Sequence, residues 1–340
     1  MRFLIVGLGS MGKRRVRCLK ALGYKTNDIA GFDVREGRRK EAEEKYGIRS
    51  YSNIGTALDS EKPSALIISV PPDFHHLYME IAIEKGIHFF VEASVVDTNM
   101  DIIKEKLRNT DIVAAPSSTL LFHPAIQRIS DILKSKVLGK VSNIIFHSGQ
   151  YLPDWHTYEK VSDYYVSNHA TGGAREIVPF ELTWLTHLFG FPKRVCGNVR
   201  KTIDIKGAEE IDDTYNFLLD YKDFMATMTI DVVSRYATRR LLINGDKKQL
   251  QWDWNQNQIQ VYDPKMNEWK SMPYEMKPAE GDYNPNIGEN MYIDELEAFI
   301  QAIEEKTLFI NSMENDHKVL KLLYAIEESD KCSTYIEFQG

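Results

Sequence analysis

The chain is poor in cysteine, has no long apolar run and carries no excess of positive charge. Its three cysteines, Cys18, Cys196 and Cys332, stand far apart and include no Cys-x-x-Cys pair. This pattern argues against a disulfide framework and favours reduced, partly buried thiols in a cytoplasmic protein. The spacing of histidine, cysteine and aspartate also lacks the arrangement of a zinc site, so we predict no metal.

Membrane and nucleic-acid functions are disfavoured as well. No segment approaches the roughly 20 apolar residues that span a bilayer, and the apolar start at Phe3–Val6 is too short for a signal peptide. A net charge of −7 disfavours nucleic acid or an anionic membrane as the main partner. What remains is a globular composition, 43% hydrophobic and 27% charged, in 340 residues, which is enough for two domains.

The short apolar run at the start of the chain leads directly into a glycine-rich loop, Gly7-Leu8-Gly9-Ser10-Met11-Gly12, and then into a helical pattern. In such a loop Gly7 permits the tight turn, Gly9 lets the backbone approach a phosphate, and Gly12 lets the helix pack close to the strand. The helix N-terminus then presents backbone N–H groups to an anion. The pattern predicts a dinucleotide site.

A second apolar segment ends in Asp33, which lies 21 residues after the last glycine of the loop. A carboxylate about 20 residues on is expected to accept hydrogen bonds from the adenosine ribose hydroxyls. Because it would repel a 2′-phosphate, we predict NAD as the cofactor. The nearby Arg35, Arg38 and Arg39 keep NADP open as the alternative, since a guanidinium binds phosphate well.

Five basic residues gather on the helix that follows the glycine loop: Lys13, Arg14, Arg15, Arg17 and Lys20. The ordinary interpretation of such a cluster is a solvated helix face, and we adopt it. A secondary effect would be a positive potential near the phosphate site, which would favour an anionic cofactor.

Strand and helix patterns alternate over the first 120 residues. The run Ala65–Val70 is continuously apolar, as expected for a strand buried on both faces. Repeated βα units predict a parallel, doubly wound sheet that binds its ligand at the carboxyl ends of the strands. Beyond residue 120 the pattern changes to helices and several strands, with a loop over Met276–Asn290. We predict a dinucleotide-binding domain over 1–120 and a second domain over 121–340.

Several motifs together resemble the Gfo/Idh/MocA family of NAD(P)-dependent oxidoreductases, over nearly the whole chain. They are the glycine loop, Asp33, Val70-Pro71-Pro72-Asp73-Phe74-His75-His76, Gly86-Ile87-His88, Phe122-His123-Pro124, Gly139-Lys140-Val141 and the helix from Gly172-Gly173-Ala174-Arg175-Glu176 to Leu188-Phe189-Gly190. The resemblance implies an α/β protein: a Rossmann doubly wound parallel sheet plus a second α/β domain with a large, open, mostly antiparallel sheet. It also implies a homodimer or homotetramer.

The chain departs from the family at the residues that transfer protons. The family's Glu-Lys-Pro segment is Glu92-Ala93-Ser94 here, so alanine replaces the lysine. On the helix that lines the family's active site, the His and Asp positions correspond to Phe180 and Thr183. An arginine that often precedes the family's His-Pro corresponds to Leu121. None of these side chains shuttles a proton at neutral pH.

Other titratable residues are therefore candidates for catalysis. The predicted catalytic residues are His169, Glu181, Tyr165, Arg175 and Glu176. His169 stands first, because imidazole is suited to proton transfer near neutral pH. Arg175 and Glu176 either form an ordinary ion pair or act separately, with Arg175 clamping an anion. The predicted cofactor-binding residues are Gly7, Gly9, Ser10, Met11, Gly12, Asp33, Ser69, Val70, Pro71, His75, Glu92 and Ala93.

An aromatic, polar loop suits a hydroxylated ring as substrate: Tyr151, Trp155, His156, Tyr158, Tyr164 and Tyr165. We predict hydride transfer to or from a sugar, a sugar nucleotide or a related polyol. Two alternatives stay open. The protein could use tightly bound NAD transiently in a non-redox reaction, such as an epimerisation or elimination, or it could bind dinucleotide or sugar without turnover.

Overall fold

The computed structural model describes residues 1–156, 159–276 and 288–339, and the chain divides into two compact units. The first unit takes in Met1–Thr119 and Glu289–His317, and the second takes in Leu120–Gly288 and Lys318–Gly340. The division predicted from the sequence, 1–120 and 121–340, stays a prediction. The compact units differ from it because a late segment of the chain returns to pack against the first helix.

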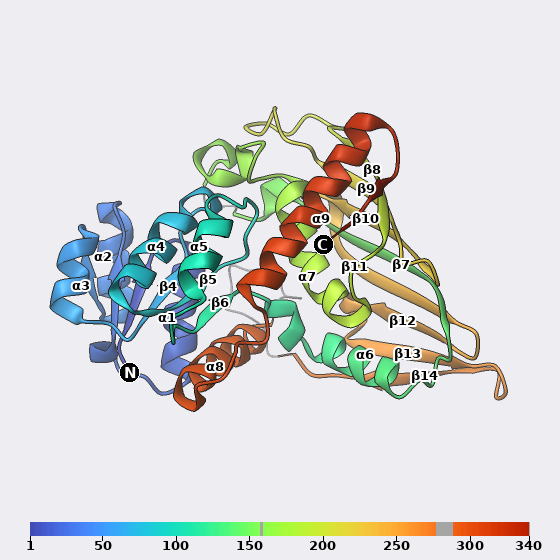
Figure 1. Cartoon of the computed structure of the whole chain (residues 1–340), viewed down its shortest axis with the longest axis horizontal. Helices are drawn as coiled ribbons and strands as arrows, with labels where there is room; N and C mark the ends of the chain where they lie inside the picture. The colour runs from blue at the N-terminus through green and yellow to red at the C-terminus, as the bar shows by residue number, and fades with distance from the viewer. Residues whose placement is uncertain (157–158, 277–287, 340) are drawn as a thin grey trace. The chain divides into compact units, whose positions relative to one another are not determined.

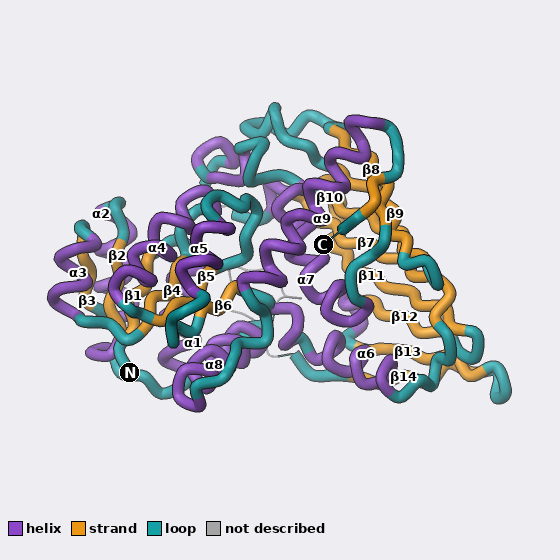
Figure 2. Tube along the Cα trace, in the orientation of Figure 1, coloured by secondary structure: helices purple, strands orange, loops and turns teal. Residues whose placement is uncertain are grey.

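A six-stranded parallel sheet forms the centre of the first unit (Figure 1). Its strands lie in the order β3-β2-β1-β4-β5-β6 (Figure 2). This is the order of a doubly wound dinucleotide-binding fold. The central strands are buried along their whole length, as their continuous apolar runs predict. The strands are β1 (Phe3–Val6), β2 (Ile29–Phe32), β3 (Arg49–Tyr51), β4 (Ala65–Ile68), β5 (His88–Val91) and β6 (Ala114–Pro116). The helices are α1 (Ser10–Ala21), α2 (Glu36–Tyr46), α3 (Ile54–Glu61), α4 (His75–Lys85), α5 (Met100–Leu107) and α8 (Asn290–Glu305).

A nine-stranded sheet forms the second unit, in the order β14-β13-β12-β11-β7-β10-β9-β8-β15. Its neighbouring strands run antiparallel except for β7 and β10, which are parallel. The strands are β7 (Val141–Tyr151), β8 (Arg194–Arg200), β9 (Thr214–Asp220), β10 (Met225–Asp231), β11 (Val233–Gly245), β12 (Gln249–Asp253), β13 (Gln258–Asp263), β14 (Glu268–Pro273) and β15 (Ile336–Glu337). The helices are α6 (Pro124–Lys134), α7 (Ala174–Phe189) and most of α9 (Met313–Cys332).

Helices cover one face of this second sheet. Helix α7 packs against β9 and β10, and α6 packs against β13 (Figure 2). Buried and exposed residues accordingly alternate along β9 and β10, because successive side chains of a strand point to opposite faces. The opposite face carries exposed Ile145, Leu218 and Met225. Thr227 of β10 lies between the first two, since it is in register with Ile145 on one side and with Leu218 on the other.

The predicted fold class is confirmed, in both the parallel sheet and the mostly antiparallel one. The sequence prediction did not single out β14 or β15. Of the predicted loop over Met276–Asn290, residues 277–287 lie outside the described residues. Short 3-10 helices occupy Thr26–Asp28, Pro72–Phe74, Thr119–Phe122, Leu152–Asp154, Val161–Asp163, Tyr165–Ser167 and Trp254–Gln256.

The prediction of a solvated basic face on α1 is wrong for its arginines. Arg14 and Arg15 are buried, and the Arg15 side chain has no solvent exposure. Its Nε and Nη2 atoms donate to the two carboxylate oxygens of Glu92 at 2.7 and 2.8 Å, and Nη2 lies 3.0 Å from Glu295. Glu289, at the N-cap of α8, pairs with Arg14 and Arg17. The late segment of the chain brings these acids to α1, so local sequence did not reveal them.

The cysteines also differ from the prediction in one respect. All three are free, with Cys18 buried and Cys196 half-buried, but Cys332 is exposed at the end of α9. Burial raises the pKa of Cys18 to about 12, so its thiol is unreactive at neutral pH.

We expect Arg15→Met to destabilise the protein by about 3–5 kcal/mol, because Glu92 and Glu295 would keep their buried positions without a matching cation. The measurement is the free energy of unfolding in urea at neutral pH. Lys13→Met is the matched control, since Lys13 and Glu41 form a more exposed pair that is worth at most about 1 kcal/mol. Equal stability of the two variants would contradict the assignment.

Candidate active site

The glycine loop is shaped by two close backbone approaches. Gly7 has a φ of +94°, and a Cβ there would lie 2.6 Å from the carbonyl oxygen of Ser69. A Cβ on Gly12 would overlap the carbonyl oxygen of Gly7, so only glycine lets α1 start this close to β1. Gly9 meets only the side chain of Arg38, at 3.3 Å. The role predicted for Gly9, to let the backbone approach a phosphate, stays a prediction.

Asp33 is held at the carboxyl end of β2 by the backbone around it. Its Oδ2 atom accepts from the N–H of Leu8 in the glycine loop and its Oδ1 atom from the N–H of Arg35, each at 2.8 Å. A carboxylate has about four acceptor positions, so two remain for ribose hydroxyls. The loop and the acid predicted to share the adenosine half of a dinucleotide are thus bonded to each other.

The three arginines beside Asp33 differ in what they contact. Arg39 donates to the carbonyl oxygens of Asp33 and Val34, at 2.8 and 3.1 Å. Arg38 places its Nη1 atom 3.7 Å from Asp33 Oδ2 and lies over Gly9. Arg38 is therefore the arginine whose guanidinium lies against the glycine loop.

The other predicted cofactor residues lie at the carboxyl ends of β4 and β5. Ser69 donates to Glu92 at 3.1 Å, and Arg15 fixes the same carboxylate. The Nε2 atom of His75 lies 2.9 Å from the carbonyl oxygen of Val70, and burial lowers the pKa of His75 to about 4. Because a carbonyl only accepts, the neutral ring carries its proton on Nε2. Its Nδ1 atom is then a buried acceptor without a hydrogen bond to the described residues.

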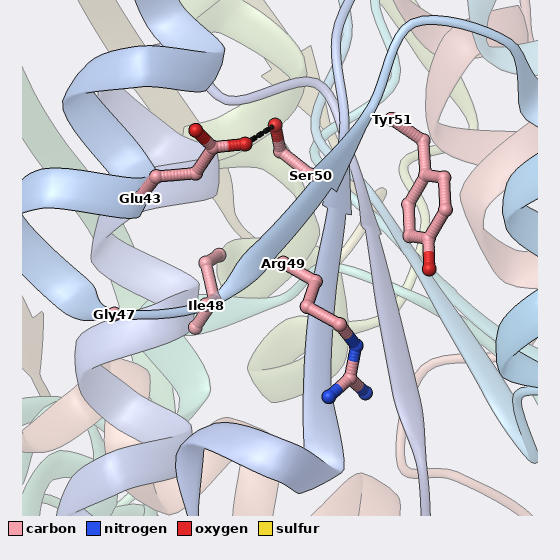
Figure 3. Close-up of a pocket in the computed structure, with 6 residues that line it drawn as sticks. All are labelled: Glu43, Gly47, Ile48, Arg49, Ser50 and Tyr51. Atoms are coloured by element: carbon pink, nitrogen blue, oxygen red, sulfur yellow. Dashed lines mark hydrogen bonds between the residues drawn. The ribbon is translucent and has the colours of Figure 1, made fainter.

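A hollow of about 480 Å³ lies elsewhere in the first unit, between α2 and β3 (Figure 3). Its lining residues are Glu43, Gly47, Ile48, Arg49, Ser50 and Tyr51, and Ser50 donates to Glu43 across it at 2.6 Å. None of the predicted cofactor or catalytic residues lines it. We do not assign a ligand to this hollow.

In the second unit, Glu181 has no solvent exposure and is surrounded by donors. Arg239 bonds to it at 2.6 and 2.9 Å, Ser148 at 2.8 Å and the Trp184 indole N–H at 2.7 Å. These contacts tie α7 to β7 and β11. Glu181 was predicted as a catalytic residue, and that role stays a prediction; the contacts that the structure shows are those of a buried ion pair that holds the fold together.

Arg175 and Glu176 do not form the ion pair that the sequence left open. The Arg175 guanidinium turns to Glu327 on α9, with Nε 2.6 Å from Oε1, and also donates to the Ala170 carbonyl oxygen. Tyr215 donates to the same Glu327 oxygen at 3.1 Å. Arg175 thus joins the start of α7 to α9, and this contact occupies it.

Glu176 instead accepts a hydrogen bond from the hydroxyl of Tyr165, at 2.5 Å. Gly172 makes this possible, because a Cβ there would overlap the Val166 carbonyl and push the tyrosine segment away from the start of α7. The residue is half-buried, but its carboxyl group is enclosed. Burial raises the pKa of Glu176 to about 7, while the Tyr165 hydrogen bond opposes part of that rise.

The remaining candidates stand at the surface or in the aromatic loop. The His169 side chain is 65% exposed and lies 3.2 Å from Asp212. His156 stacks on Tyr164 and bonds to Glu159. Tyr158 lies outside the described residues. At the positions where the family resemblance predicts titratable groups, Phe180 is half-buried, and Thr183 is buried and donates to the Pro179 carbonyl.

Solved structures share this architecture over their full length. Levoglucosan dehydrogenase in complex with NADH and levoglucosan matches with a TM-score of 0.86 and 16% identity, covering 100% of both chains. A probable dehydrogenase from Thermotoga maritima matches with a TM-score of 0.81 and 18% identity, covering 99% of each chain. An oxidoreductase from Agrobacterium radiobacter, in complex with NAD+, L-tartaric acid and magnesium, reaches 0.85 at 13% identity, covering 99% of this chain and 98% of that one. At such identities the likeness shows the fold.

No curated protein sequence matches the chain. Within the described ranges, no helix combines the length and the apolar character needed to cross a bilayer.

Family models match both parts of the sequence. A model described as an oxidoreductase family with an NAD-binding Rossmann fold matches residues 1–104. A model of the GFO/IDH/MocA C-terminal domain matches residues 126–251. The predicted family is confirmed: the chain belongs to the Gfo/Idh/MocA oxidoreductases, and its first domain is their NAD-binding Rossmann fold.

Proposed function

We propose that this protein is an NAD-dependent dehydrogenase that oxidises or reduces a sugar, a sugar nucleotide or a related polyol. The observation that carries the proposal is the hydrogen bond between Asp33 and the glycine loop, at the carboxyl end of the parallel sheet. This bond supports the proposal because it joins the loop that we propose as the diphosphate site to the carboxylate that we propose as the ribose acceptor. The likeness in fold to levoglucosan dehydrogenase, solved with NADH and levoglucosan, supports a sugar-like substrate.

The residues of the first unit would hold the two halves of the cofactor. The N-terminus of α1 would receive the diphosphate, and Asp33 would accept from the adenosine ribose. The nicotinamide half would lie toward Ser69, Val70, Pro71, His75, Glu92 and Ala93. When bound, the nicotinamide supplies the hydride acceptor. The buried Nδ1 atom of His75 offers an acceptor to a hydroxyl or amide donor of that half.

The aromatic loop of the second unit would hold the substrate. Trp155 and Tyr164 supply flat surfaces suited to the apolar face of a sugar ring. The buried indole N–H of Trp155 has no hydrogen-bond acceptor among the described residues, and a substrate hydroxyl would supply one.

We further propose a cytoplasmic homodimer or homotetramer. Three free cysteines support a reducing compartment. The exposed apolar residues Ile145, Leu218 and Met225 on the uncovered face of the second sheet support self-association, since such a surface is costly to leave in water.

Wild-type protein should form or consume NADH with at least one member of a panel of sugars, sugar nucleotides and polyols. Ala93→Lys should weaken cofactor binding and bring no gain in turnover, because Arg15 already neutralises the adjacent Glu92. The measurement is the change in NADH absorbance, with Ala93→Met as the uncharged control of similar length. Higher activity in Ala93→Lys than in Ala93→Met would contradict this. If the protein retains NAD but catalyses no net redox reaction, the result would favour an enzyme that uses bound NAD transiently in a non-redox reaction. Binding of cofactor or sugar without any reaction would favour a protein that binds its ligand without turnover.

The protein should bind NADH more tightly than NADPH, because Asp33 would repel a 2′-phosphate. Asp33→Ala should weaken NADH binding about tenfold or more, as expected for losing hydrogen bonds to a charged group worth about 1.5–3 kcal/mol. Arg38→Ala should lower NADPH affinity more than NADH affinity. Calorimetric titration with both cofactors checks this, with the exposed Arg35→Ala as control. Tighter binding of NADPH by the wild type would sink the proposal.

Light scattering should give a mass that is a multiple of the 39.2 kDa chain. Ile145→Lys should lower that mass by placing a charge in the centre of the proposed interface. Met266→Lys is the control, since Met266 is exposed in the turn between β13 and β14. A wild-type monomer at micromolar concentration, or an equal effect of both variants, would count against the interface.

A further inference from the structure

Tyr165 and Glu176 form a pair at the start of the helix that faces the second sheet. Tyr165 begins a single 3-10 turn, and Glu176 lies in the first turn of α7. Their hydroxyl–carboxyl hydrogen bond, at 2.5 Å, joins a partly exposed phenol to an enclosed carboxyl group. The pair therefore connects the outside of the domain with a buried acid.

Among the residues that the structure describes, no cation forms an ion pair with the Glu176 carboxyl. Its second oxygen, Oε2, is buried and makes no hydrogen bond to the part of the chain that the structure describes. The neighbouring Arg175 binds Glu327, and the buried Arg239 binds Glu181. Burying a carboxylate that accepts only one hydrogen bond is costly, and burial raises the pKa of Glu176 to about 7. Near neutral pH the carboxyl group therefore binds and releases its proton about equally readily.

The other titratable residues near α7 are engaged or exposed. Glu181 and Arg175 hold the fold together, and His169 lies in a loop, paired with Asp212. Ala93, Phe180 and Thr183 hold no titratable group. Tyr165 is left as the predicted candidate that is both accessible and bonded to a buried acid.

We propose that Tyr165 exchanges the proton of the substrate hydroxyl, and that Glu176 behind it is the site that stores this proton. This inference rests on the proposed dehydrogenase function. Tyr165 would be the catalytic residue, since its oxygen would touch the reacting hydroxyl. Glu176 would be a positioning residue that acts through it.

The proton and electron movements balance for alcohol oxidation. The substrate O–H bond would break as Tyr165 accepts the proton, and an oxidised nicotinamide, when bound, would take the hydrogen of the substrate carbon together with its electron pair. Tyr165 gives its own proton to Glu176 Oε1 in the same step. The products would be a carbonyl compound, the reduced cofactor and a protonated Glu176, which returns the proton to water through the hydroxyl of Tyr165 after the product leaves. Reduction runs through the same movements in reverse.

The test uses Tyr165→Phe and Glu176→Gln in the full-length protein, with kcat and KM measured against pH. For oxidation, Glu176 must be ionised to accept a proton, so wild-type kcat/KM should rise about tenfold per unit below pH 7 and level off above it. Glu176→Gln should lose this rise, and both variants should lose roughly 10²–10⁴-fold in kcat with little change in KM. Tyr221→Phe, which removes a buried hydroxyl in the turn after β9, and Asp316→Asn, which neutralises another buried carboxyl, are the matched controls.

A second readout does not depend on turnover. The carboxyl infrared signal of Glu176 should titrate near pH 7 in the wild type, disappear in Glu176→Gln and shift to higher pH in Tyr165→Phe, because the hydrogen bond that favours the ionised form is gone. Glu176→Gln should also be at least as stable as the wild type above pH 7, since it removes a buried charge. If no alcohol on the panel reacts, the proposed function fails, and this signal alone decides whether the proton-storing pair exists.

Three outcomes would overturn the inference while leaving the dehydrogenase intact. They are turnover in Tyr165→Phe within a few-fold of wild type, an unchanged pH profile in Glu176→Gln, and a large loss of turnover seen in His169→Ala but not in Tyr165→Phe.

Discussion

The guanidinium of Arg15 has no contact with solvent and lies between two carboxylates, Glu92 at the end of β5 and Glu295 on α8. Glu295 in turn accepts from Ser117, from the Ser118 backbone and from Thr119, so one buried charge connects four segments of the first unit. Removing Arg15 would leave both carboxylates without their cation. The late return of the chain through α8 is thus a condition for burying the helix that follows the glycine loop.

This network also reaches the candidate cofactor site. Because Arg15 binds both oxygens of Glu92, the carboxylate is fixed where β5 ends, and Ser69 at the end of β4 donates to it. The ends of two neighbouring strands are therefore held at the place where a doubly wound sheet binds its ligand. The stability of the first unit and the shape of the candidate site both depend on the ion pair between Arg15 and Glu92. Ala93, with its small side chain, follows Glu92 directly in the sequence.

Features formed by residues close together in the sequence could be predicted, whereas ion pairs between residues far apart in the sequence could not. The glycine loop and Asp33 could be recognised because strand, turn, helix and acid follow one another within 33 residues. The arginines of α1 were misread as a solvated face, since Glu289 and Glu295 come more than 270 residues later. The ion pair of Glu181 was missed for the same reason, because its partner Arg239 lies on β11, 58 residues later in the sequence. The periodicity of the sequence does not indicate that Glu176 bonds to Tyr165 and not to Arg175. The Tyr165–Glu176 hydrogen bond depends on the tight turn at Gly172.

Two glutamates on α7, Glu176 and Glu181, have the same side chain but different surroundings, and these surroundings give them different properties. Glu181 receives a guanidinium, a hydroxyl and an indole N–H, so its charge is matched on every side and binds the helix to the sheet. Glu176 lies five residues earlier, in the first turn of the helix. It accepts one hydrogen bond, from the hydroxyl of Tyr165, and burial raises its pKa to about 7. A fully matched charge is stable and inert, whereas a poorly matched acid can change its protonation state at neutral pH. The chain lacks the titratable side chains its family resemblance predicts, yet on the same helix it retains one acid whose environment allows proton exchange.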